Sequence, residues 1–259
     1  MEITVPRTIT VMRYITPLRE GGSLPALAEA DDGFRYVLKF RGAGHGVKML
    51  ISELLGGLIA ARLGLRVPEL VFAELDADFG RTEGDEEIQD LLKFSEGLNL
   101  GLHFLSGALA YEPSIPIDTF EASKIVWFDA FVTNIDRTYK NTNLLWWHKE
   151  LWVIDNGASL YFHHSWKDFE HAARSPFPYV KDHVLLSQAA ELPQADAYAR
   201  QVLGSDFFEA AVKLIPEQWL QWEGTDETPG QIRQVYIDFL THRLENSELF
   251  LKQAIHARE

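Results

Sequence analysis

The sequence predicts an α+β protein with two lobes, the first rich in β-strands and the second mainly helical. Strand-like and helix-like patterns alternate over the first hundred residues, whereas the pattern from residue 116 onward is mainly helical. A chain of 259 residues with 46% hydrophobic composition can build one large domain or two lobes around a core of ordinary size. We place the lobes at residues 1–105 and 106–259 and treat them as one unit.

The composition limits the classes of partner. The chain has 24 Lys and Arg residues against 38 Asp and Glu residues, and its formal net charge of −14 would repel a polyanion, so no nucleic acid is expected. It has no cysteine and therefore no disulfide or thiolate metal site. The N-terminal stretch lacks the apolar core of a signal peptide, and no window is long enough for a membrane span. We expect a cytoplasmic protein without a membrane partner.

The first lobe opens with strand patterns. Apolar and β-branched residues recur at about period two in "TITVMRYI" (8–15), which predicts the first strand. A glycine pair then precedes another strand pattern, Asp32-Gly33 is a hairpin signal, and "FRYVLKF" (34–40) is the strand that follows it. This segment is predicted to be a β-hairpin entered through glycines.

A helix follows over residues 47–65. It ends near Gly64 and Pro68, and one apolar stripe recurs at helical intervals, with Glu53 one turn into the helix. The stripe consists of Leu50, Leu54, Leu58, Ala61 and Leu65. The rest of the lobe is predicted to contain a strand over 69–75, a short helix over 84–94 and an extended segment over 98–105.

The second lobe is predicted to consist mainly of helices with one hairpin. Leu144 to Trp147 and Leu151 to Ile154 read as two strands joined by the turn "HKE". The Pro-rich stretch 174–182 reads as a loop. The predicted helices cover residues 120–135, 205–215 and 229–257.

The stretch "NIDRTYKNTNLLWWHKELWVIDNG" concentrates the polar chemistry. Closing the hairpin brings Asn141, before its first strand, beside Asp155, after its second, and an amide oxygen with a carboxylate suits Mg²⁺. Asp136, one loop away, is free to act as a base, and this combination is what phosphoryl transfer requires. Taken alone the pattern is weak, because Asp and Asn are also common loop residues that bond to their own backbone.

Lys39 and Glu53 form a second candidate pair. Lys39 lies among apolar neighbours in a strand, and Glu53 faces the same direction as the leucine stripe of the next helix. Each is costly to bury alone, whereas together they form an ion pair that directs the lysine toward nucleotide phosphates. The alternative is that Lys39 extends to solvent from a half-exposed strand and that Glu53 is a first-turn acid that favours the helix dipole.

The order of these features resembles the protein-kinase-like fold. More narrowly, "NIDRTYKN" together with "VIDNG" resembles the HipA-like kinases, and the D-R-x-x-x-N core is also similar to that of the phosphatidylinositol kinases. The resemblance covers roughly residues 10–160 and implies a bilobal kinase fold that uses ATP and Mg²⁺. It implies that Asp136 is the catalytic base, that Asn141 and Asp155 bind magnesium, that Lys39 binds phosphate and Glu53 anchors it, and that Gly21, Gly22 and Ser23 cover the phosphates.

The sequence also departs from related patterns. It has no G-x-G-x-x-G, no His before an Arg-Asp pair, and D-N-G stands where ordinary protein kinases carry D-F-G. The chain is shorter than the full HipA toxins, which weakens the transfer of a toxin role or of a DNA-binding antitoxin partner to this chain.

We therefore expect an enzyme that transfers the γ-phosphoryl group of ATP to a hydroxyl group, most readily on protein Ser or Thr. A small-molecule alcohol is a chemically equivalent acceptor, and a lipid is the weakest, since no basic amphipathic segment is visible. Two different functions stay open beside this one. The first is a nucleotide-binding pseudokinase that serves as an interaction scaffold, and the second is an AMP transferase on the same fold.

Overall fold

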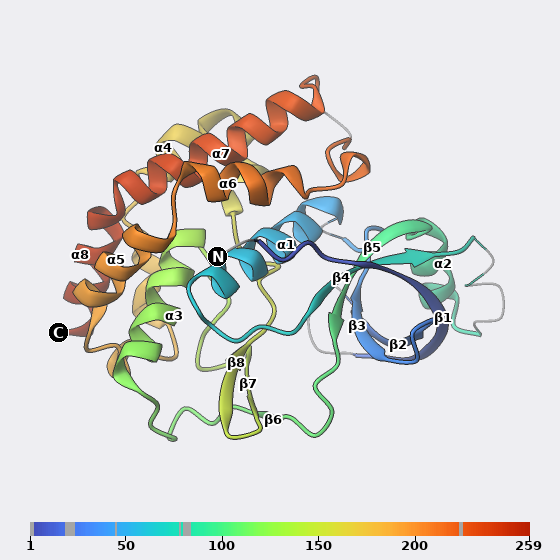
Figure 1. Ribbon diagram of the computed structural model, residues 1–259, viewed down its shortest axis with the longest axis horizontal. Coiled ribbons are helices and arrows are strands. Elements are labelled where there is room, and N and C mark those ends of the chain that lie inside the picture. Colours follow the sequence, from blue (N-terminus) through green and yellow to red (C-terminus); the bar gives the residue numbers. More distant parts are fainter. Residues whose placement is uncertain (1–2, 19–23, 45, 78, 80–83, 223–224) are drawn as a thin grey trace.

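A computed structural model describes residues 3–18, 24–44, 46–77, 79, 84–222 and 225–259. Strands dominate the N-terminal part of the chain and helices dominate the C-terminal part (Figure 1). This order of elements agrees with the α+β class that the sequence predicts.

Five strands form a closed barrel in the N-terminal part. They are β1 (Thr8–Pro17), β2 (Ala26–Ala30), β3 (Arg35–Lys39), β4 (Leu70–Leu75) and β5 (Gly97–His103). Their order is β1-β2-β3-β5-β4, and β1 closes the barrel by pairing in parallel with β4, whereas the other pairs are antiparallel. The predicted turn between β2 and β3 is confirmed, with Gly33 at a φ of 79° that only glycine adopts easily.

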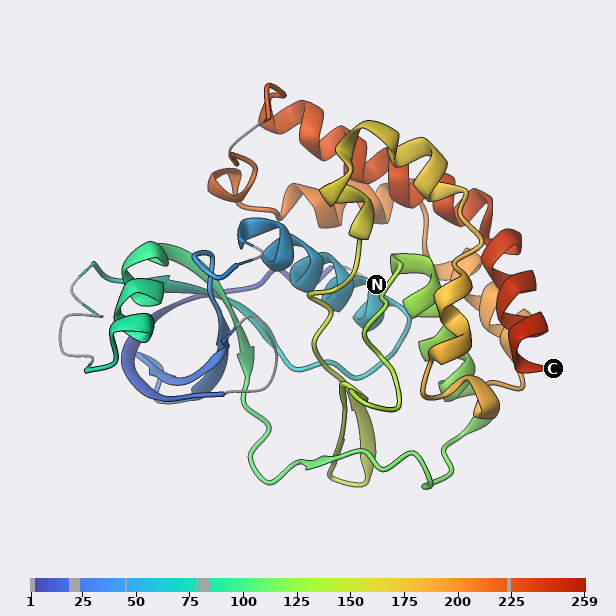
Figure 2. The same ribbon diagram turned by 180° about the vertical axis from the view of Figure 1, so that it is seen from behind.

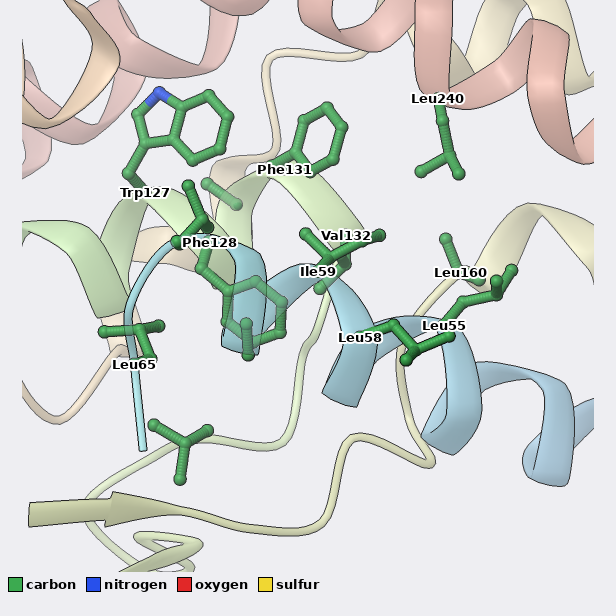
Figure 3. Close-up of a cluster of buried hydrophobic side chains, with 14 of the residues drawn as sticks. Leu55, Leu58, Ile59, Leu65, Trp127, Phe128, Phe131, Val132, Leu160 and Leu240 are labelled. Atoms are coloured by element: carbon green, nitrogen blue, oxygen red, sulfur yellow. The ribbon is translucent and has the colours of Figure 1, made fainter. Parts of the chain in front are cut away.

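Helix α1 (Gly46–Arg62) leaves the barrel and enters the core of the C-terminal part. Every residue from Met49 to Ala60 is buried, so the helix is covered on all sides rather than along one stripe as predicted. In Figure 3 its residue Ile59 lies beside Val132 of α3 (Thr119–Val132), and its residue Leu55 lies beside Leu160. This packing fixes the position of Glu53 in the middle of the helix.

The C-terminal part is built mainly from α3, α5 (Leu192–Val202), α6 (Ser205–Lys213), α7 (Pro229–Glu245) and α8 (Ser247–Arg258). Asp118 caps α3, and Thr228 with Gln231 forms a capping box on α7. The predicted helix 229–257 is interrupted at Asn246, whose side chain bonds to the carbonyl oxygen of His242. None of the helices in the described residues is both long and apolar enough to cross a membrane.

Shorter elements complete the structure. They are α2 (Glu86–Phe94) and α4 (Phe169–Ala173), with the 3₁₀ turns η2 (Tyr161–His164), η3 (Trp166–Asp168), η4 (Pro178–Asp182), η5 (Leu186–Gln188) and η6 (Glu217–Trp219). The predicted loop 174–182 therefore contains one 3₁₀ turn, and α4 and α5 were not predicted.

A small sheet stands at the edge of the C-terminal part. Its order is β6 (Leu109–Ala110), β7 (Leu144–Trp147) and β8 (Glu150–Val153), and β6 was not predicted. The hairpin β7–β8 is confirmed with a shorter turn, because Trp147 pairs with Glu150. The two turn residues, His148 and Lys149, have φ of 49° and 65°, which matches the twist that a two-residue hairpin needs.

Candidate active site

A cleft of about 960 Å³ is lined by residues of the barrel and of the C-terminal part. Its polar lining residues include Lys39, Asp136, Lys140, Asn141 and Asp155. Its apolar lining residues include Val37, Leu102, Leu105, Leu145 and Ile154. The cleft thus combines charged groups with an apolar surface that suits a flat heterocyclic ring.

Lys39 is the last residue of β3, and its side chain is 5% exposed. Its Nζ lies 2.9 Å from Oδ1 of Asp155 and 4.0 Å from Oε2 of Glu53. The predicted pairing with Glu53 is present at this longer distance, and the closer partner is Asp155. Burial lowers the pKa of Lys39, but the charges of Glu53 and Asp155 outweigh it and leave the pKa raised.

Glu53 lies about two turns into α1, so it is not the first-turn acid of the alternative interpretation. Its side chain is fully buried, and among the described residues neither carboxyl oxygen has a hydrogen-bond partner. Burial raises the pKa of Glu53 to about 7, against the opposing charge of Lys39. The N–H of Asn156 also lowers this pKa, although its geometry falls short of a hydrogen bond. Glu53 is therefore a buried acid whose nearest compensating charge is Lys39.

Asp136 follows α3 in a loop and is half-buried. Its Oδ2 accepts hydrogen bonds from Nδ2 of Asn141 at 2.8 Å and of Asn143 at 3.3 Å. Burial raises the pKa of Asp136, and the charge of Asp155 adds to this effect, while the two amide hydrogen bonds oppose it. Asp136 therefore binds a proton more tightly than an ordinary aspartate, as a general base should.

The segments at the two ends of the hairpin β7–β8 carry Asn141 and Asp155. Next to the open end of the hairpin, the N–H of Ile154, which follows β8, donates to the carbonyl of Asn143, which precedes β7, at 3.1 Å. Asp155 has a φ of 54°, which is unusual for a residue other than glycine and turns the chain sharply at this point. Both predicted magnesium ligands line the cleft together with Asp136 and Lys39.

The donor set of these two side chains fits a hard divalent cation. Nδ2 of Asn141 is turned to Asp136, so its Oδ1 is the acceptor that remains, and Asp155 uses only Oδ1 toward Lys39. The described residues contain no group of three or more His, Asp or Glu side chains that could hold a metal. An ion bound here would take its other ligands from water and phosphate oxygens, as Mg²⁺ commonly does.

Arg137 contacts several parts of the candidate site, and sequence reasoning did not single it out. It follows Asp136 directly, its side chain is fully buried, and its Nε lies 2.5 Å from Oδ2 of the buried Asp129. The same guanidinium donates to the carbonyl oxygens of Asn143 and Ile154, so one side chain joins the Asp136 loop to both ends of the hairpin. The visible signal was an acid, Asp129, within the otherwise apolar stretch 125–132 of α3. Asp129 is thus buried and paired with Arg137, and it does not line the cleft.

The segment that was expected to cover the phosphates, Gly21, Gly22 and Ser23, lies outside the described residues. Two described residues near this segment, Leu18 and Pro25, line the cleft. The N–H of Leu18 donates to the carbonyl of Pro25 at 2.7 Å. The role of the three residues stays a prediction.

Comparisons with known proteins place the chain among kinases. The family model for HipA-like kinases matches residues 11–252. No match was found among curated proteins. The crystal structure of the Helicobacter pylori proinflammatory kinase CtkA is similar with a TM-score of 0.56 and 13% identity, over 96% of this chain and 99% of that chain. The Golgi casein kinase with Mn/ADP bound gives a TM-score of 0.45 and 11% identity, over 96% of this chain and 74% of that chain. The likeness to CtkA shows a kinase-like fold.

Proposed function

Because this chain belongs to the HipA-like kinase family, we propose that it transfers the γ-phosphoryl group of ATP to a hydroxyl group, with protein Ser or Thr as the first acceptor to test. In this proposal residues 1–105 and 106–259 are the two lobes, and the nucleotide lies in the cleft between them. One observation carries the proposal: Lys39, from a strand of the barrel, lines the same cleft as Asp136, Asn141 and Asp155, which lie about 100 residues later in the sequence.

The nucleotide side of the cleft follows from charge and shape. The buried ammonium group of Lys39 is a donor for phosphate oxygens, and Glu53 keeps it from turning away. The apolar residues Val37, Leu102 and Ile154 offer a surface for the adenine ring. Leu18 and Pro25 lie before and after the segment that we expect to cover the phosphates, and both line the cleft.

The groups proposed to carry out the transfer are two carboxylates and one amide in the cleft. Asn141 and Asp155 would hold Mg²⁺, which when bound neutralises phosphate charge and orients the phosphates. Asp136 accepts the proton of the acceptor hydroxyl, the hydroxyl oxygen forms a bond to the γ-phosphorus, and the bond from that phosphorus to ADP breaks. The raised pKa of Asp136 fits this role as a base.

The acceptor hydroxyl is chosen from the family resemblance. Protein Ser or Thr follows from the family resemblance, and a small-molecule alcohol requires the same groups. The cytoplasmic location likewise stays a prediction from composition. The presence of Lys39, Glu53, Asp136, Asn141 and Asp155 together favours an active enzyme over a pseudokinase scaffold.

Intact-mass measurement with ATP and Mg²⁺, alone and with candidate acceptors, tests the proposal. A gain of phosphate on the chain or on an acceptor supports a kinase, a gain of AMP supports the reversed chemistry, and no modification in any mixture favours the scaffold. Asp136→Asn is the control variant, because it keeps an oxygen that accepts from Asn141 and removes the base. It should bind nucleotide nearly normally and transfer phosphate on the order of 100-fold more slowly.

A further inference from the structure

The chain between η4 and η5 is fastened to the loop that carries Asp136. Thr138 and His183 form an isolated antiparallel bridge, and the N–H of Val184 donates to the carbonyl of Arg137 at 3.1 Å. Both 3₁₀ turns contact α3, and Figure 2 shows this part of the chain beside that helix. Residues 183–184, more than 40 residues further along the sequence, are thus hydrogen-bonded to the loop that carries Asp136.

The hydrogen bonds of His183 fix its tautomer. The N–H of Leu185 donates to Nδ1 at 3.0 Å, so Nδ1 is an acceptor and carries no proton. The proton of the neutral ring is therefore on Nε2, which lies 2.9 Å from Oδ2 of Asp129 and donates to it. His183 is buried, so water does not compete for either bond.

The carboxylate of Asp129 bonds to two residues close to the predicted base Asp136, namely Asn134 and Arg137. On one side its Oδ1 accepts from Nδ2 of Asn134 at 2.9 Å, and Oδ1 of Asn134 accepts from the N–H of Asp136 at 3.1 Å. On the other side Asp129 pairs with Arg137. Arg137 bonds to both carboxylate oxygens, through Nε to Oδ2 and through Nη2 to Oδ1, and the bond from His183 to Oδ2 further restricts rotation of the carboxylate about its terminal bond.

We propose that His183 is a positioning residue for Asp136, acting through Asp129 and its partners Asn134 and Arg137. The inference rests on the proposed function, because it assigns a purpose to the geometry of the base. The same network reaches the hairpin, since Arg137 also bonds to the backbone of Ile154, next to Asp155. Loss of the His183 bond should therefore disturb the reactive side of the cleft more than the binding of nucleotide.

Two substitutions separate the two hydrogen bonds of His183. In His183→Asn the amide oxygen stands where Nδ1 stood, so the bond from Leu185 can be kept while the donor to Asp129 is lost. In His183→Gln the longer side chain brings an N–H to the place of Nε2, so the donor to Asp129 can be kept while the bond from Leu185 is lost. If His183 had a purely structural role, the two variants would show similar changes in loop exchange and in kcat.

Two readouts are measured on the full chain. Amide hydrogen exchange of peptides covering residues 133–143 reports the order of the loop with or without activity. Phosphotransfer kinetics separate kcat from the KM for ATP. For His183→Asn we expect faster exchange in this loop and a kcat lowered on the order of 10- to 100-fold, as for other residues that orient a reactive group indirectly. His183→Gln should stay within roughly threefold of the parent kcat, and both variants should keep the KM for ATP within roughly threefold.

Tyr236→Phe is the matched control, because it removes a buried hydrogen bond of 3.0 Å to a different histidine, His163. It should lower stability and leave loop exchange and kcat unchanged. The proposal is overturned if His183→Gln loses as much kcat as His183→Asn, or if Tyr236→Phe changes the loop as His183→Asn does. Should His183→Asn not fold, Asn134→Ala, which removes the other arm of the network, must speed exchange in the loop, or the proposal fails. If the parent protein showed no phosphotransfer, the proposed function would be refuted. The role of His183 would still be decided by hydrogen exchange.

Discussion

Replacing Glu53 with Gln should change how the stability of the protein depends on pH. Glu53 is fully buried, no described donor bonds to its carboxyl oxygens, and Lys39 lies 4.0 Å away. Gln has nearly the same volume and carries no charge at any pH. The substitution therefore removes a titrating group from the core and leaves the packing of α1 in place.

The magnitude follows from the pKa of Glu53, which burial raises from its ordinary value of 4.5 to about 7. Between these values the folded protein keeps the proton that the unfolded chain releases, so the stability that this group contributes is present at low pH and is lost as the pH rises through about 7. The difference between the two pKa values corresponds to about 3 kcal/mol. Most of this difference falls between pH 5 and pH 8, so Glu53→Gln should gain about 2–3 kcal/mol relative to the parent over that range.

Urea denaturation of both proteins at about pH 5 and about pH 8 measures this difference as a change in the free energy of unfolding. The control is Glu74→Gln on β4, where the side chain is exposed and the same substitution should make little difference at either pH. If the free energies of Glu53→Gln and the parent ran parallel over this range to within about 0.5 kcal/mol, burial would not be raising the pKa of Glu53.

Three further outcomes follow from the contacts in the cleft. Asn141→Ala and Asp155→Ala should each weaken Mg²⁺-dependent nucleotide binding, on the order of tenfold, in calorimetry with and without Mg²⁺, and parent-like binding by both would place the metal elsewhere. Lys39→Ala should lower nucleotide affinity by a similar factor even without Mg²⁺, since it removes a phosphate contact, and an unchanged Kd would contradict that contact. Gly56→Ala should lower the thermal stability by about 1–3 kcal/mol, because the new Cβ would lie 2.6 Å from Cβ of Asn156, and an unchanged melting temperature would show that the two segments can separate freely.

Much of the fold could be predicted because its signals are local. Alternating residues, the Asp32-Gly33 turn and the hairpin β7–β8 each act within a few residues, and the structure confirms them. The order of these elements was enough to indicate that Lys39 and Asp155 would share a cleft. The helix break at Asn246 is also local, but it lies inside a continuous helical pattern and has no Gly or Pro to mark it.

The contacts that could not be predicted join residues far apart in the sequence. Nothing in the pattern around Lys39 shows that Asp155, rather than Glu53, lies within 2.9 Å of it, because that distance depends on how α1 and the hairpin pack together. The bond between His183 and Asp129 spans 54 residues and connects a loop to a helix interior. Polar residues at such positions look like surface residues or isolated oddities until the fold brings them together.

The charges around the cleft link the binding of nucleotide, the binding of a divalent cation and the protonation of Asp136. The charges of Glu53, Asp136 and Asp155 all act on the buried ammonium group of Lys39, in a chain whose formal net charge is −14. A nucleotide triphosphate entering this region would meet like charge, since Lys39 is already engaged by two of the three carboxylates. Cations held by Asn141 and Asp155 would reverse the sign of the local field, so divalent ions should favour nucleotide binding more than an increase in ionic strength does. The same positive charge would lower the proton affinity of Asp136, which burial and Asp155 now raise, so that the base is unprotonated when the nucleotide is in place.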